Sequence, residues 1–445
     1  MITKISVTGF KSLNNFKLKI SPGLNILVGP NGSGKTNIVA FFEFLSNLAK
    51  SGIPSAVAGI GGAGALFTRK KTAGFAKSIS AIVSGCVKIK NKKYFLYKYA
   101  FSIKWQQNTQ TVDFHSQEIC VRHVDKFVVA DDMDTHENDW EFVVRQDIGK
   151  KGVKKISVAR LEGQFKKSMY LPWGSRNNTK KIGRFLERGL AGGTILNCLR
   201  FYANFPALYM DIIGGESYNI IPSHVKLPED STREPLIAKD GVGLAATLYS
   251  MTNEHISRYP RLSGGMRFFQ HMPIQDKINK EKLLKYIKIA NPCISDIDVR
   301  NDPFSNHLNL IVTIASGRRN IQLPFSSMSD GTIKWITLIT AILGSFSVFS
   351  IEEPENYLHP LIQSQLLQII RDIIKAKDAP SFTLMTTHSE TILNSSDPDE
   401  LVVVSFADGR TKARRCLNTK VLNAEIKKTG FGLGYYYLTG VLNHE

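Results

Sequence analysis

The feature that most constrains the fold is the stretch GLNILVGPNGSGKTNIVAFFEFL, which starts at residue 23. Its apolar segment LNILV leads through a glycine-rich turn into a segment whose apolar residues recur with helical spacing. Strand, turn and helix together frame the pattern G-x-x-x-x-G-K-[ST], with Gly29, Gly34, Lys35 and Thr36 at its fixed positions. The sequence therefore predicts a P-loop, which binds phosphate between a buried strand and a helix.

The chemistry of this loop explains its residue types. Glycines allow successive backbone N–H groups to turn inward around phosphates, closer than a Cβ would permit. Lys35 can reach the β- and γ-phosphates, and the Thr36 hydroxyl can bind Mg²⁺. The N-terminus of the following helix adds favourable positive partial charge. We therefore expect a nucleoside triphosphate and Mg²⁺ as ligands.

A second strand carries the carboxylates that such a site requires. In VFSIEEPENYLHP, residues 348–360, a short apolar run ends in Glu352 and Glu353, and Pro354 stops the strand. Side chains alternate along a strand, so we expect the two carboxylates to point in different directions. Glu352 is assigned to the Mg²⁺ shell and Glu353 to the general base that activates water.

A third strand is predicted in SFTLMTTHSE, which ends at His388. A histidine at this place can form a hydrogen bond with a γ-phosphate or with the attacking water. The alternative is a structural histidine at a strand end. The neighbouring motifs favour the role in catalysis.

Two segments compete for the signature loop, which in ABC-type ATPases contacts the nucleotide of another subunit. LSGGM at residues 262–266 differs in one residue from the LSGGQ signature of these ATPases. MSDGT at residues 328–332 is the second candidate and matches that signature less closely. Only the second is followed by a helix and then by the carboxylate strand, so its residues lie at an anion-binding helix N-terminus. We expect Ser329 and Gly331 to offer a hydroxyl and an N–H, with Asp330 tolerating the turn, and we prefer Ser329 over Ser263.

The chain is strongly basic, with 445 residues and a formal charge of +19. Much of this charge lies in residues 145–188, which hold many Lys and Arg against three acidic residues. An acidic stretch, DDMDTHENDWE, precedes them. The two stretches are either solvated faces that partly neutralise each other or a surface that attracts phosphate backbones, acidic proteins or anionic lipid.

Several features favour a cytoplasmic protein outside the membrane. The N-terminus alternates like a strand and lacks the pattern of a signal peptide. The apolar run 333–351 contains Lys334, so it predicts a buried helix and a core strand. The cysteines show no metal-binding spacing and are expected to be buried and to take no part in chemistry: Cys86, Cys120, Cys198, Cys293 and Cys416.

The four segments GPNGSGKTN, MSDGT, IEEPENYLHP and TTHS, in that order, resemble the ABC-type ATPases of the SMC, RecF and OLD-nuclease group. The opening FKSLNNFKLKI and the later DGVGLAATL are also similar to this group. The resemblance implies an ATPase head split by a long insertion, with ATP held between the P-loop of one head and the signature of another. It therefore implies a homo-oligomer, at least a dimer.

Carried over position by position, the resemblance assigns roles to individual residues. Nucleotide-binding positions are Gly29, Asn31, Gly32, Ser33, Gly34, Lys35, Thr36, Asn37 and Lys11; metal positions are Thr36 and Glu352; catalytic positions are Glu353 and His388; the trans signature is Ser329, Asp330 and Gly331. The glutamine of the family's Q-loop has three candidates, Gln106, Gln107 and Gln117.

Two features that occur in some members of this group are missing from the sequence. No sustained heptads predict the long coiled coil of SMC proteins, and the segment after His388 shows no acidic motifs of a TOPRIM nuclease. Such heads resemble ATPase subunits of bacterial anti-phage systems, PtuA of Septu and retron systems and AriA of PARIS. The expected partner is then a separate effector, a TOPRIM or HNH nuclease, with nucleic acid or a phage protein as trigger.

Three alternatives remain open: a RecF-like ATPase of DNA repair or replication, a transporter ATPase, and a P-loop protein with very slow hydrolysis. The transporter reading is disfavoured because Thr36 and Ser329 lie nearly three hundred residues apart.

The fold class expected is α/β, an ABC-type head built as a mixed sandwich of two lobes. The P-loop lobe would span residues 1–130, with antiparallel strands in SISAIVSG and KKYFLYKYAFSIKW. A basic, partly helical insertion would span 131–300, and the lobe with signature, carboxylate strand and histidine would span 301–445.

Overall fold

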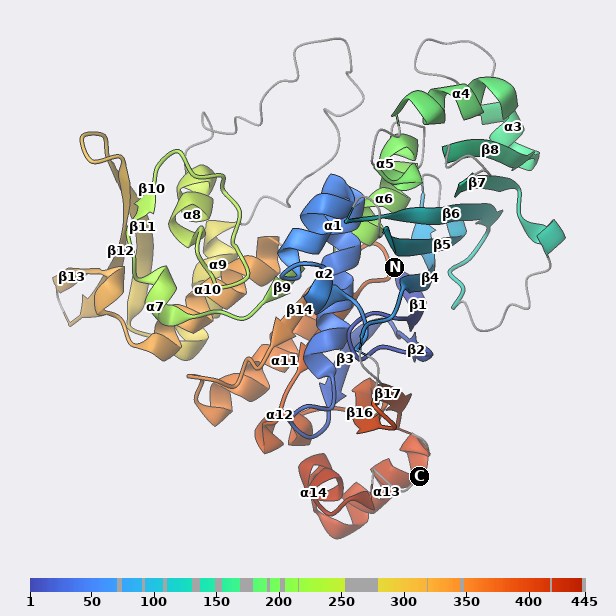
Figure 1. The fold of residues 1–445 in the computed structure, drawn as a ribbon. Coiled ribbons are helices and arrows are strands. Elements are labelled where there is room, and N and C mark those ends of the chain that lie inside the picture. The colour runs from blue at the N-terminus through green and yellow to red at the C-terminus, as the bar shows by residue number, and fades with distance from the viewer. Residues whose placement is uncertain are drawn as a thin grey trace.

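The computed structural model describes most of the chain. The described residues are 1–69, 74–89, 93–106, 110–129, 137–148, 154–168, 179–189, 193–200, 205–214, 216–252, 279–317, 319–344, 348–416 and 418–441. Figure 1 shows the long helix α1 (Lys35–Gly59) in the centre of the molecule, with one group of strands and helices on each side of it.

One side is a seven-stranded antiparallel sheet in the order β2-β1-β4-β5-β6-β7-β8. The two strands expected from their alternating patterns are present as β4 and β5. The sheet also continues across residue 130, where the sequence had suggested a boundary. Its strands are β1 (Ile2–Thr8), β2 (Phe16–Lys19), β4 (Ser78–Lys88), β5 (Tyr94–Gln106), β6 (Thr111–Val124), β7 (Phe142–Ile148) and β8 (Lys154–Leu161).

The central sheet has six strands in the order β17-β16-β3-β15-β14-β9. Five of them run parallel, and only β17 is antiparallel to its neighbour. They are β3 (Gly23–Val28), β9 (Glu216–Tyr218), β14 (Val348–Glu352), β15 (Phe382–Thr386), β16 (Leu401–Ala407) and β17 (Arg410–Arg415). The P-loop strand, the carboxylate strand and the histidine strand of the sequence prediction are β3, β14 and β15.

Helix α1 lies between these two sheets and is buried by aromatic contacts on both sides. Phe41 and Phe44 pack on Phe10, with ring centroids 5.5 and 5.4 Å apart. Phe42 packs on Phe382 of β15 at 6.0 Å. Because aromatic side chains bury large areas, this helix joins the sheets into one core. The helix is kinked at Gly52, which has φ 79°, shortly before Pro54.

The other face of the central sheet is covered by helices, and a small sheet packs against the outer side of these helices (Figure 1). The predicted buried helix after MSDGT is α10 (Asp330–Gly344), and β14 follows it, as expected. The other covering elements are α8 (Leu244–Thr252), α9 (Lys280–Ala290) and α11 (Pro360–Lys375), with the strands β10 (Glu229–Asp230), β11 (Ile294–Asp302), β12 (His307–Ser316) and β13 (Arg319–Pro324). The α/β class expected from the sequence is confirmed.

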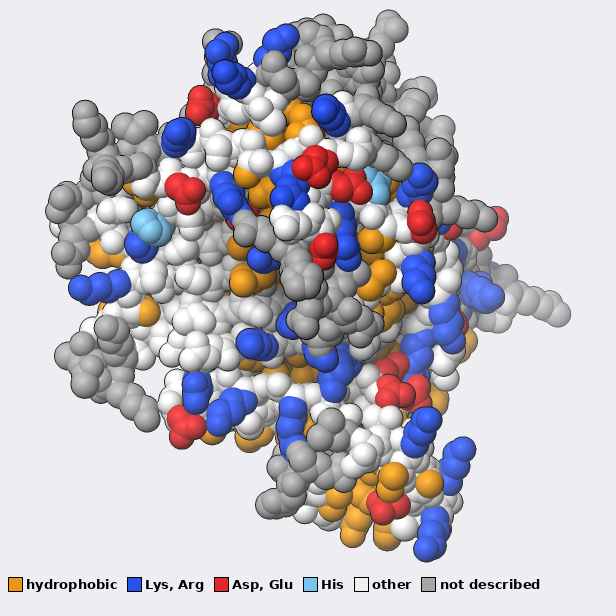
Figure 2. All heavy atoms as spheres, turned by 90° about the vertical axis from the view of Figure 1, so that its right-hand side faces the viewer, with side chains coloured by type: hydrophobic (Ala, Val, Ile, Leu, Met, Phe, Trp, Pro, Cys, Tyr) orange, Lys and Arg blue, Asp and Glu red, His pale blue; other side chains and the backbone are white. Residues whose placement is uncertain are grey.

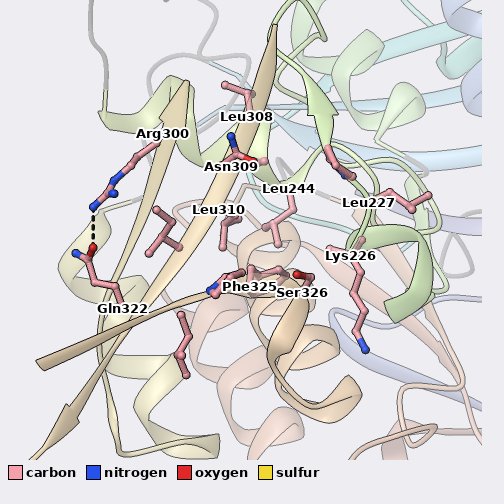
Figure 3. A pocket seen from close by; sticks show the side chains of 16 residues that line it. Lys226, Leu227, Leu244, Arg300, Leu308, Asn309, Leu310, Gln322, Phe325 and Ser326 are labelled. Carbon is pink, nitrogen blue, oxygen red and sulfur yellow. Dashed lines mark hydrogen bonds between the residues drawn. The ribbon is translucent and has the colours of Figure 1, made fainter. Parts of the chain in front are cut away.

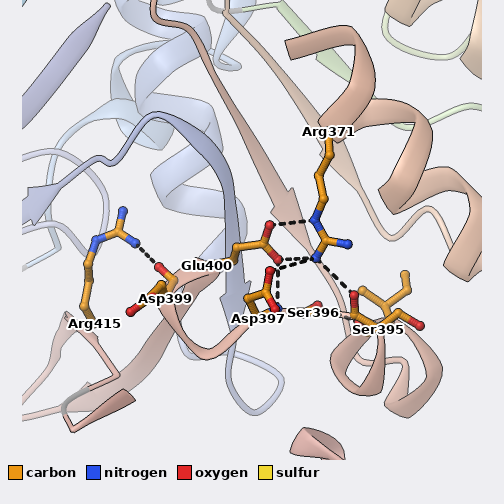
Figure 4. A network of polar contacts seen from close by, with 8 residues as sticks. Arg371, Ser395, Ser396, Asp397, Asp399, Glu400 and Arg415 are labelled. Atoms are coloured by element: carbon orange, nitrogen blue, oxygen red, sulfur yellow. Dashed lines mark hydrogen bonds and ion pairs between the residues drawn. The ribbon is translucent and has the colours of Figure 1, made fainter. Parts of the chain in front are cut away.

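The C-terminal part is attached to the central sheet by a polar network (Figure 4). Arg371 of α11 donates two hydrogen bonds to Glu400, at 2.9 and 2.6 Å, and one to the backbone oxygen of Ser395. Glu400 directly precedes the first residue of β16. This bidentate ion pair therefore fixes the start of β16, which lies beside β3. Three helices complete this part: α12 (Glu390–Asn394), α13 (Thr419–Thr429) and α14 (Leu433–Leu438).

The region expected as an insertion contains both helices and strands. Its helices on the side of the antiparallel sheet are α3 (Gly163–Ser168), α4 (Thr179–Gly189), α5 (Ile195–Leu199) and α6 (Phe205–Ile213). Two short helices lie elsewhere, α2 (Ala63–Leu66) and α7 (Pro222–Val225). Because β7, β8 and β9 belong to the two large sheets, much of this region is integral to the head. The three-part division of the chain remains a prediction.

Two further expectations can be compared with the structure. Cys86, Cys120 and Cys198 are buried as expected, whereas Cys293 is exposed and Cys416 half-buried. The expectation of burial was therefore wrong for Cys293, which follows Asn291 and Pro292 in the turn that leads into β11. Among the described residues, no helix is both long and apolar enough to cross a membrane.

Candidate nucleotide-binding site

Three strand ends meet at one edge of the central sheet. β3, β15 and β14 are parallel neighbours, and their register aligns Leu27 with Thr386 and Thr386 with Glu352. The P-loop after β3, the histidine segment after β15 and the carboxylates after β14 therefore leave the sheet on the same side. In open parallel sheets, ligands bind at this carboxyl edge.

The P-loop glycines are required by conformation and by close approach. Gly32 and Gly34 have φ of 77° and 100°, in the left-handed region that favours glycine. A Cβ at Gly29 would collide with the backbone oxygen of Val404, and one at Gly34 with the side chain of Thr411. The loop is thus packed against β16 and β17, which the sequence prediction did not include.

Lys35 and its neighbours fit a phosphate ligand. The Lys35 ammonium is buried and donates to the backbone oxygens of Gly29 at 2.8 Å and Pro30 at 3.1 Å. Burial lowers the pKa of Lys35, against the charges of Glu353 and Glu355. The Ser33 hydroxyl is buried without a hydrogen-bond partner among the described residues. A buried cation and an unsatisfied hydroxyl in one loop are what an anionic ligand would satisfy.

Asn31, Gly32 and Thr36 are exposed on the loop and the first turn of α1, so all three are accessible to a ligand. Thr36 follows Lys35 directly at the start of the helix, where its hydroxyl can take the metal position predicted for it.

A network of polar side chains supports the P-loop on the side of β17. The Thr411 hydroxyl donates to the backbone oxygen of Ser33 at 3.0 Å and lies 2.6 Å from the Ser12 hydroxyl. The amide of Asn37 donates to the same Ser12 hydroxyl at 2.7 Å. The Asn37 amide is therefore engaged in supporting the loop, although the sequence had assigned this residue to nucleotide binding. Ser12 and Thr411 were not predicted, since 399 residues separate them.

Glu352 is buried and paired with a lysine that the sequence did not reveal. Its Oε1 accepts from Lys239 Nζ at 2.7 Å and from the Ser217 hydroxyl at 3.3 Å. Lys239 Nζ also lies 2.8 Å from Oε1 of Glu43 on α1. Burial opposes the charge of Lys239, but hydrogen bonds to Glu352 and Glu43 raise its pKa on balance. The candidate metal carboxylate is thus part of a charged cluster.

Lys11 belongs to the same cluster. Burial lowers the pKa of Lys11, and the charges of Glu43, Lys239 and Glu352 act on it. Its backbone has φ 45°, a conformation uncommon for residues other than glycine, and its N–H donates to the backbone oxygen of Leu66. Lys11 therefore lies on the carboxylate side of the site.

Glu353 is exposed, whereas the preceding residue, Glu352, is buried. β14 ends at Glu352, and Glu353 has φ 44°. The two carboxylates therefore diverge because the chain leaves the strand at this point, whereas we had expected strand alternation to separate them. The Glu353 N–H donates to the backbone oxygen of Thr386, and Asn356 donates to Glu353 Oε2 at 3.1 Å. Its exposed carboxylate can reach a water molecule.

His388 is exposed and its backbone is fixed by a residue without a predicted role. Glu355 Oε1 accepts from the His388 N–H at 2.7 Å and from the Thr387 hydroxyl at 3.0 Å. Glu355 Oε2 is buried without a partner among the described residues. The loop after β14 therefore positions the loop after β15.

MSDGT, the segment predicted as the signature, lies at the start of α10, where a helix was expected. The exposed Ser329 hydroxyl accepts from the Thr332 N–H at 3.3 Å, and Asp330 forms an ion pair with Lys226 at 2.7 Å. A Cβ at Gly331 would crowd the backbone oxygen of Tyr357 at 2.6 Å. Gly331 is therefore needed for close packing against the loop that follows the carboxylates.

Lys334 links the signature helix to the same loop. It is almost fully buried, donates to the backbone oxygen of Glu353 at 3.1 Å, and lies 5.7 Å from the ring of Tyr357. Burial lowers the pKa of Lys334 to about 8, against the charges of Glu355 and Glu353.

A cavity of about 440 Å³ lies near the signature but away from the nucleotide edge (Figure 3). Its walls come from β12, from β13 and from the segment between α7 and β10, and Arg300 donates to Gln322 at 2.7 Å on one side. Phe325 and Ser326 line it and precede Ser329 in the chain.

Some predictions lie outside the described residues. These are the competing segment LSGGM at 262–266, with Ser263, and the Q-loop candidate Gln107. Gln117 is buried in the antiparallel sheet, where it bonds to Tyr99 and Gln146, so it is a core residue. Gln106 is the last residue of β5.

Two family models match separate parts of the chain. Residues 1–181 match a family described as an AAA ATPase domain. Residues 271–394 match a family described as an AAA domain, putative AbiEii toxin, type IV TA system. The first match contains the P-loop, and the second contains MSDGT, the two carboxylates and His388.

Curated relatives match short segments. The DNA replication and repair protein RecF of Erwinia tasmaniensis is 45% identical over 38 residues, 8% of this chain and 10% of the relative. RecF of Corynebacterium jeikeium is 35% identical over 54 residues, 12% of this chain and 13% of the relative. The chain therefore matches only a small fraction of the length of either relative.

Solved SMC heads are distantly similar over most of the chain. An Smc head bound to the C-winged helix domain of ScpA has a TM-score of 0.46 at 16% identity and covers 93% of this chain and 97% of that one. An Smc head from Pyrococcus furiosus with an extended coiled coil, bound to the C-terminal domain of ScpA, has a TM-score of 0.45 at 15% identity, covering 96% and 99%.

The family matches and the site geometry lead to one class. The matched AAA ATPase domains contain the P-loop, MSDGT, the two carboxylates and His388, and three of these motifs meet at one edge of the central sheet, which supports the ABC-type ATPase class. This confirms the class predicted from the motifs. The narrower prediction of an anti-phage defence subunit remains a prediction.

Proposed function

We propose that this protein hydrolyses ATP with the help of Mg²⁺ at the edge formed by β3, β15 and β14. The observation that carries the proposal is the shared edge itself, which combines the buried Lys35, the buried Glu352 and the exposed Glu353. Lys35 and the P-loop N–H groups bind the phosphates. Thr36 and Glu352 would hold Mg²⁺, which neutralises phosphate charge when bound.

The remaining roles belong to the exposed residues of this edge. Glu353 accepts a proton from the attacking water, and the His388 imidazole donates a hydrogen bond to the γ-phosphate or orients the water. Asn356 and Glu355 support them by hydrogen bonds to the Glu353 carboxylate and to the His388 N–H.

A second subunit would complete the site. Ser329 and Gly331 stand at the exposed start of α10, where a hydroxyl and backbone N–H groups are available to a phosphate. We therefore propose a homo-oligomer, at least a dimer in the ATP-bound state, in which the signature of one head contacts the nucleotide of the other.

The proposed biological role is a nucleotide-gated sensor or scaffold in bacterial anti-phage defence. In this role the ATPase controls a separate effector, a TOPRIM or HNH nuclease. Two observations support it: the motif resemblance to PtuA and AriA, and the description of the family that matches residues 271–394, which names a putative toxin of a toxin–antitoxin system.

A RecF-like role in DNA repair or replication is the second candidate. The two RecF matches support it, and so does the charge of +19. Figure 2 shows many Lys and Arg side chains on the face that carries the antiparallel sheet, with Asp and Glu among them. Helix α4 contributes the exposed Lys180, Lys181 and Arg184.

The activity is tested with the purified protein and radiolabelled ATP. We expect Mg²⁺-dependent release of phosphate and an ATP-dependent increase in mass by light scattering. A Lys35→Ala variant should lose both. Failure of the wild-type protein to bind ATP would refute the proposed site.

The two roles are separated by nucleic-acid binding and by infection. A RecF-like protein should bind DNA with an affinity that falls steeply with salt, because phosphate contacts release counterions. A defence subunit, expressed with its neighbouring genes, should reduce phage plaques, and Lys35→Ala should abolish that protection. DNA binding without protection favours the RecF-like role.

A further inference from the structure

Lys239 occupies the side of the nucleotide site where a metal ion is expected. Its ammonium lies 2.7 Å from Glu352 and 2.8 Å from Glu43. The two carboxylates are only 8% and 20% exposed, so each would be costly to leave without a positive partner. A single ammonium thus bridges two carboxylates that face the same space.

The backbone holds Lys239 firmly in this place. The Lys239 oxygen accepts from the Asn219 N–H at 2.7 Å, and the Ala238 N–H donates to Val242 at 2.7 Å. Between them, Gly241 turns the chain with φ 97° and lies so close to Val225 that a Cβ would crowd that side chain. The turn 238–242 is therefore anchored, and it presents the Lys239 side chain to the two carboxylates.

The charges of the cluster balance without a metal. Two carboxylates, Glu43 and Glu352, are matched by two cations, Lys11 and Lys239. A free dication entering this cluster would meet two cations and no excess negative charge. ATP changes the balance because its phosphates bring several negative charges. The Lys239 side chain is 46% exposed, so it can turn toward solvent when a metal arrives.

We propose that Lys239 holds the place of the metal ion in the nucleotide-free protein, so that Mg²⁺ enters the site only together with ATP. The inference rests on the proposed function, because it takes Glu352 as the metal carboxylate. It adds to that function an order of binding: the lysine keeps the carboxylates neutral, and the metal–nucleotide complex displaces it.

The test measures metal binding without nucleotide. Mn²⁺, which is paramagnetic, is titrated into nucleotide-free protein, and free Mn²⁺ is followed by electron paramagnetic resonance. Wild type should bind Mn²⁺ only weakly at this site. Lys239→Met should bind one Mn²⁺ with a dissociation constant at least about tenfold lower than wild type. Lys239→Arg, which keeps the charge, should behave as wild type.

Lys50→Met is the matched control. Lys50 is also paired with a carboxylate, Glu216, at 3.6 Å, and its side chain is 35% exposed. Among the described ion pairs, Lys50 has none with Glu43 or Glu352. Its replacement should leave Mn²⁺ binding unchanged.

Three outcomes would overturn the proposal. They are Mn²⁺ binding by wild type that is as tight as binding by Lys239→Met, no gain of Mn²⁺ binding in the Met variant, and loss of Mn²⁺ binding by the Met variant in the presence of ATP. The last result would make Lys239 a support for the metal. If Lys239→Met does not fold by circular dichroism, Lys239→Gln is titrated instead, with the same expected gain. Binding of a fluorescent ATP analogue is measured in parallel. If wild type did not bind this analogue, the proposed function would be refuted, independently of the result of the Mn²⁺ titration.

Discussion

The nucleotide edge and the signature segment differ in how far one chain completes them. At the edge, Glu352 is buried and paired with Lys239, and Lys35 is buried on the P-loop. At the predicted signature, Ser329 is exposed, and within the described part of the chain its hydroxyl bonds only inside its own turn. In the proposed site, one head therefore supplies the phosphate-binding and carboxylate half, the closed half, and exposes the signature half, the open half, at its surface. This is the arrangement expected if a second copy completes it.

The largest expected effect concerns the closed half. Glu353→Gln should lower kcat for ATP hydrolysis by about 100-fold or more, because a general base contributes on that scale, while ATP binding persists. Steady-state phosphate release and analogue binding measure the two quantities. Glu425→Gln, on the exposed side of α13, is the control and should be silent. Equal turnover of wild type and Glu353→Gln would show that Glu353 is not the base.

The next effect concerns the open half. Ser329→Arg should abolish ATP-dependent dimerisation and lower hydrolysis about tenfold or more, while monomers still bind ATP, since the P-loop is unchanged. Light scattering with and without ATP measures the first effect. Ser263→Arg, in the competing segment LSGGM, should leave dimerisation intact. The reverse pattern would move the signature to LSGGM.

A third variant tests how the two strand-end loops are joined. Glu355→Ala removes the acceptor of two hydrogen bonds, from His388 N–H and the Thr387 hydroxyl. Unsatisfied donors cost about 1–3 kcal/mol, so we expect kcat to fall about tenfold. Glu355→Gln keeps a side-chain oxygen and should recover most of the loss. A silent Glu355→Ala would mean that His388 is positioned by other contacts.

Lys334 gives a pH-dependent test of the contact between signature helix and carboxylate loop. Burial lowers its pKa from 10.5 to about 8 in the folded protein. Between these values the unfolded chain binds more protons than the folded one, so this group makes stability rise with pH. Relative to Lys334→Met, wild type should therefore gain stability from pH 7.5 to 9.5. Urea unfolding midpoints at both values measure this gain, and a constant difference would contradict it.

The smallest effect concerns the support of the P-loop. Thr411→Val removes the hydrogen bond to the Ser33 oxygen and should lower the free energy of unfolding by about 1 kcal/mol, with a modest loss of ATP affinity. Chemical denaturation and analogue binding measure these changes. Thr439→Val removes a hydroxyl that donates to the Tyr435 oxygen of α14, and it should not change ATP affinity. An unchanged affinity in Thr411→Val would show that the loop keeps its shape without this bond.

Motifs with strong local geometry were predicted well. The strand, glycine turn and helix of the P-loop, the helix after MSDGT and the strand ending in Glu352 all appear where the sequence placed them. These features depend on residues close together in the chain, such as Gly34 and Lys35. Periodicity and turn chemistry therefore suffice to find them.

The partners of the site were not predictable in the same way. Ser217 and Lys239 contact Glu352, and Lys239 also pairs with Glu43 on α1, but nothing local in the sequence marks these residues as neighbours. Glu355 lies within the motif IEEPENYLHP, but its hydrogen bonds to the loop that contains His388 exist only because β14 and β15 are adjacent. The extent of the first sheet, which continues past residue 130, likewise follows from pairing between strands.

The sequence by itself determined the class of the site, because glycines, a lysine and paired carboxylates at these spacings fix the local chemistry for a phosphate ligand. Tertiary structure alone decided the state of each charge. The same residue type is buried and lysine-bound at Glu352 but exposed at Glu353, because the strand ends between them. It also decided which half of the site one head completes, since burial and charge pairing depend on segments hundreds of residues apart.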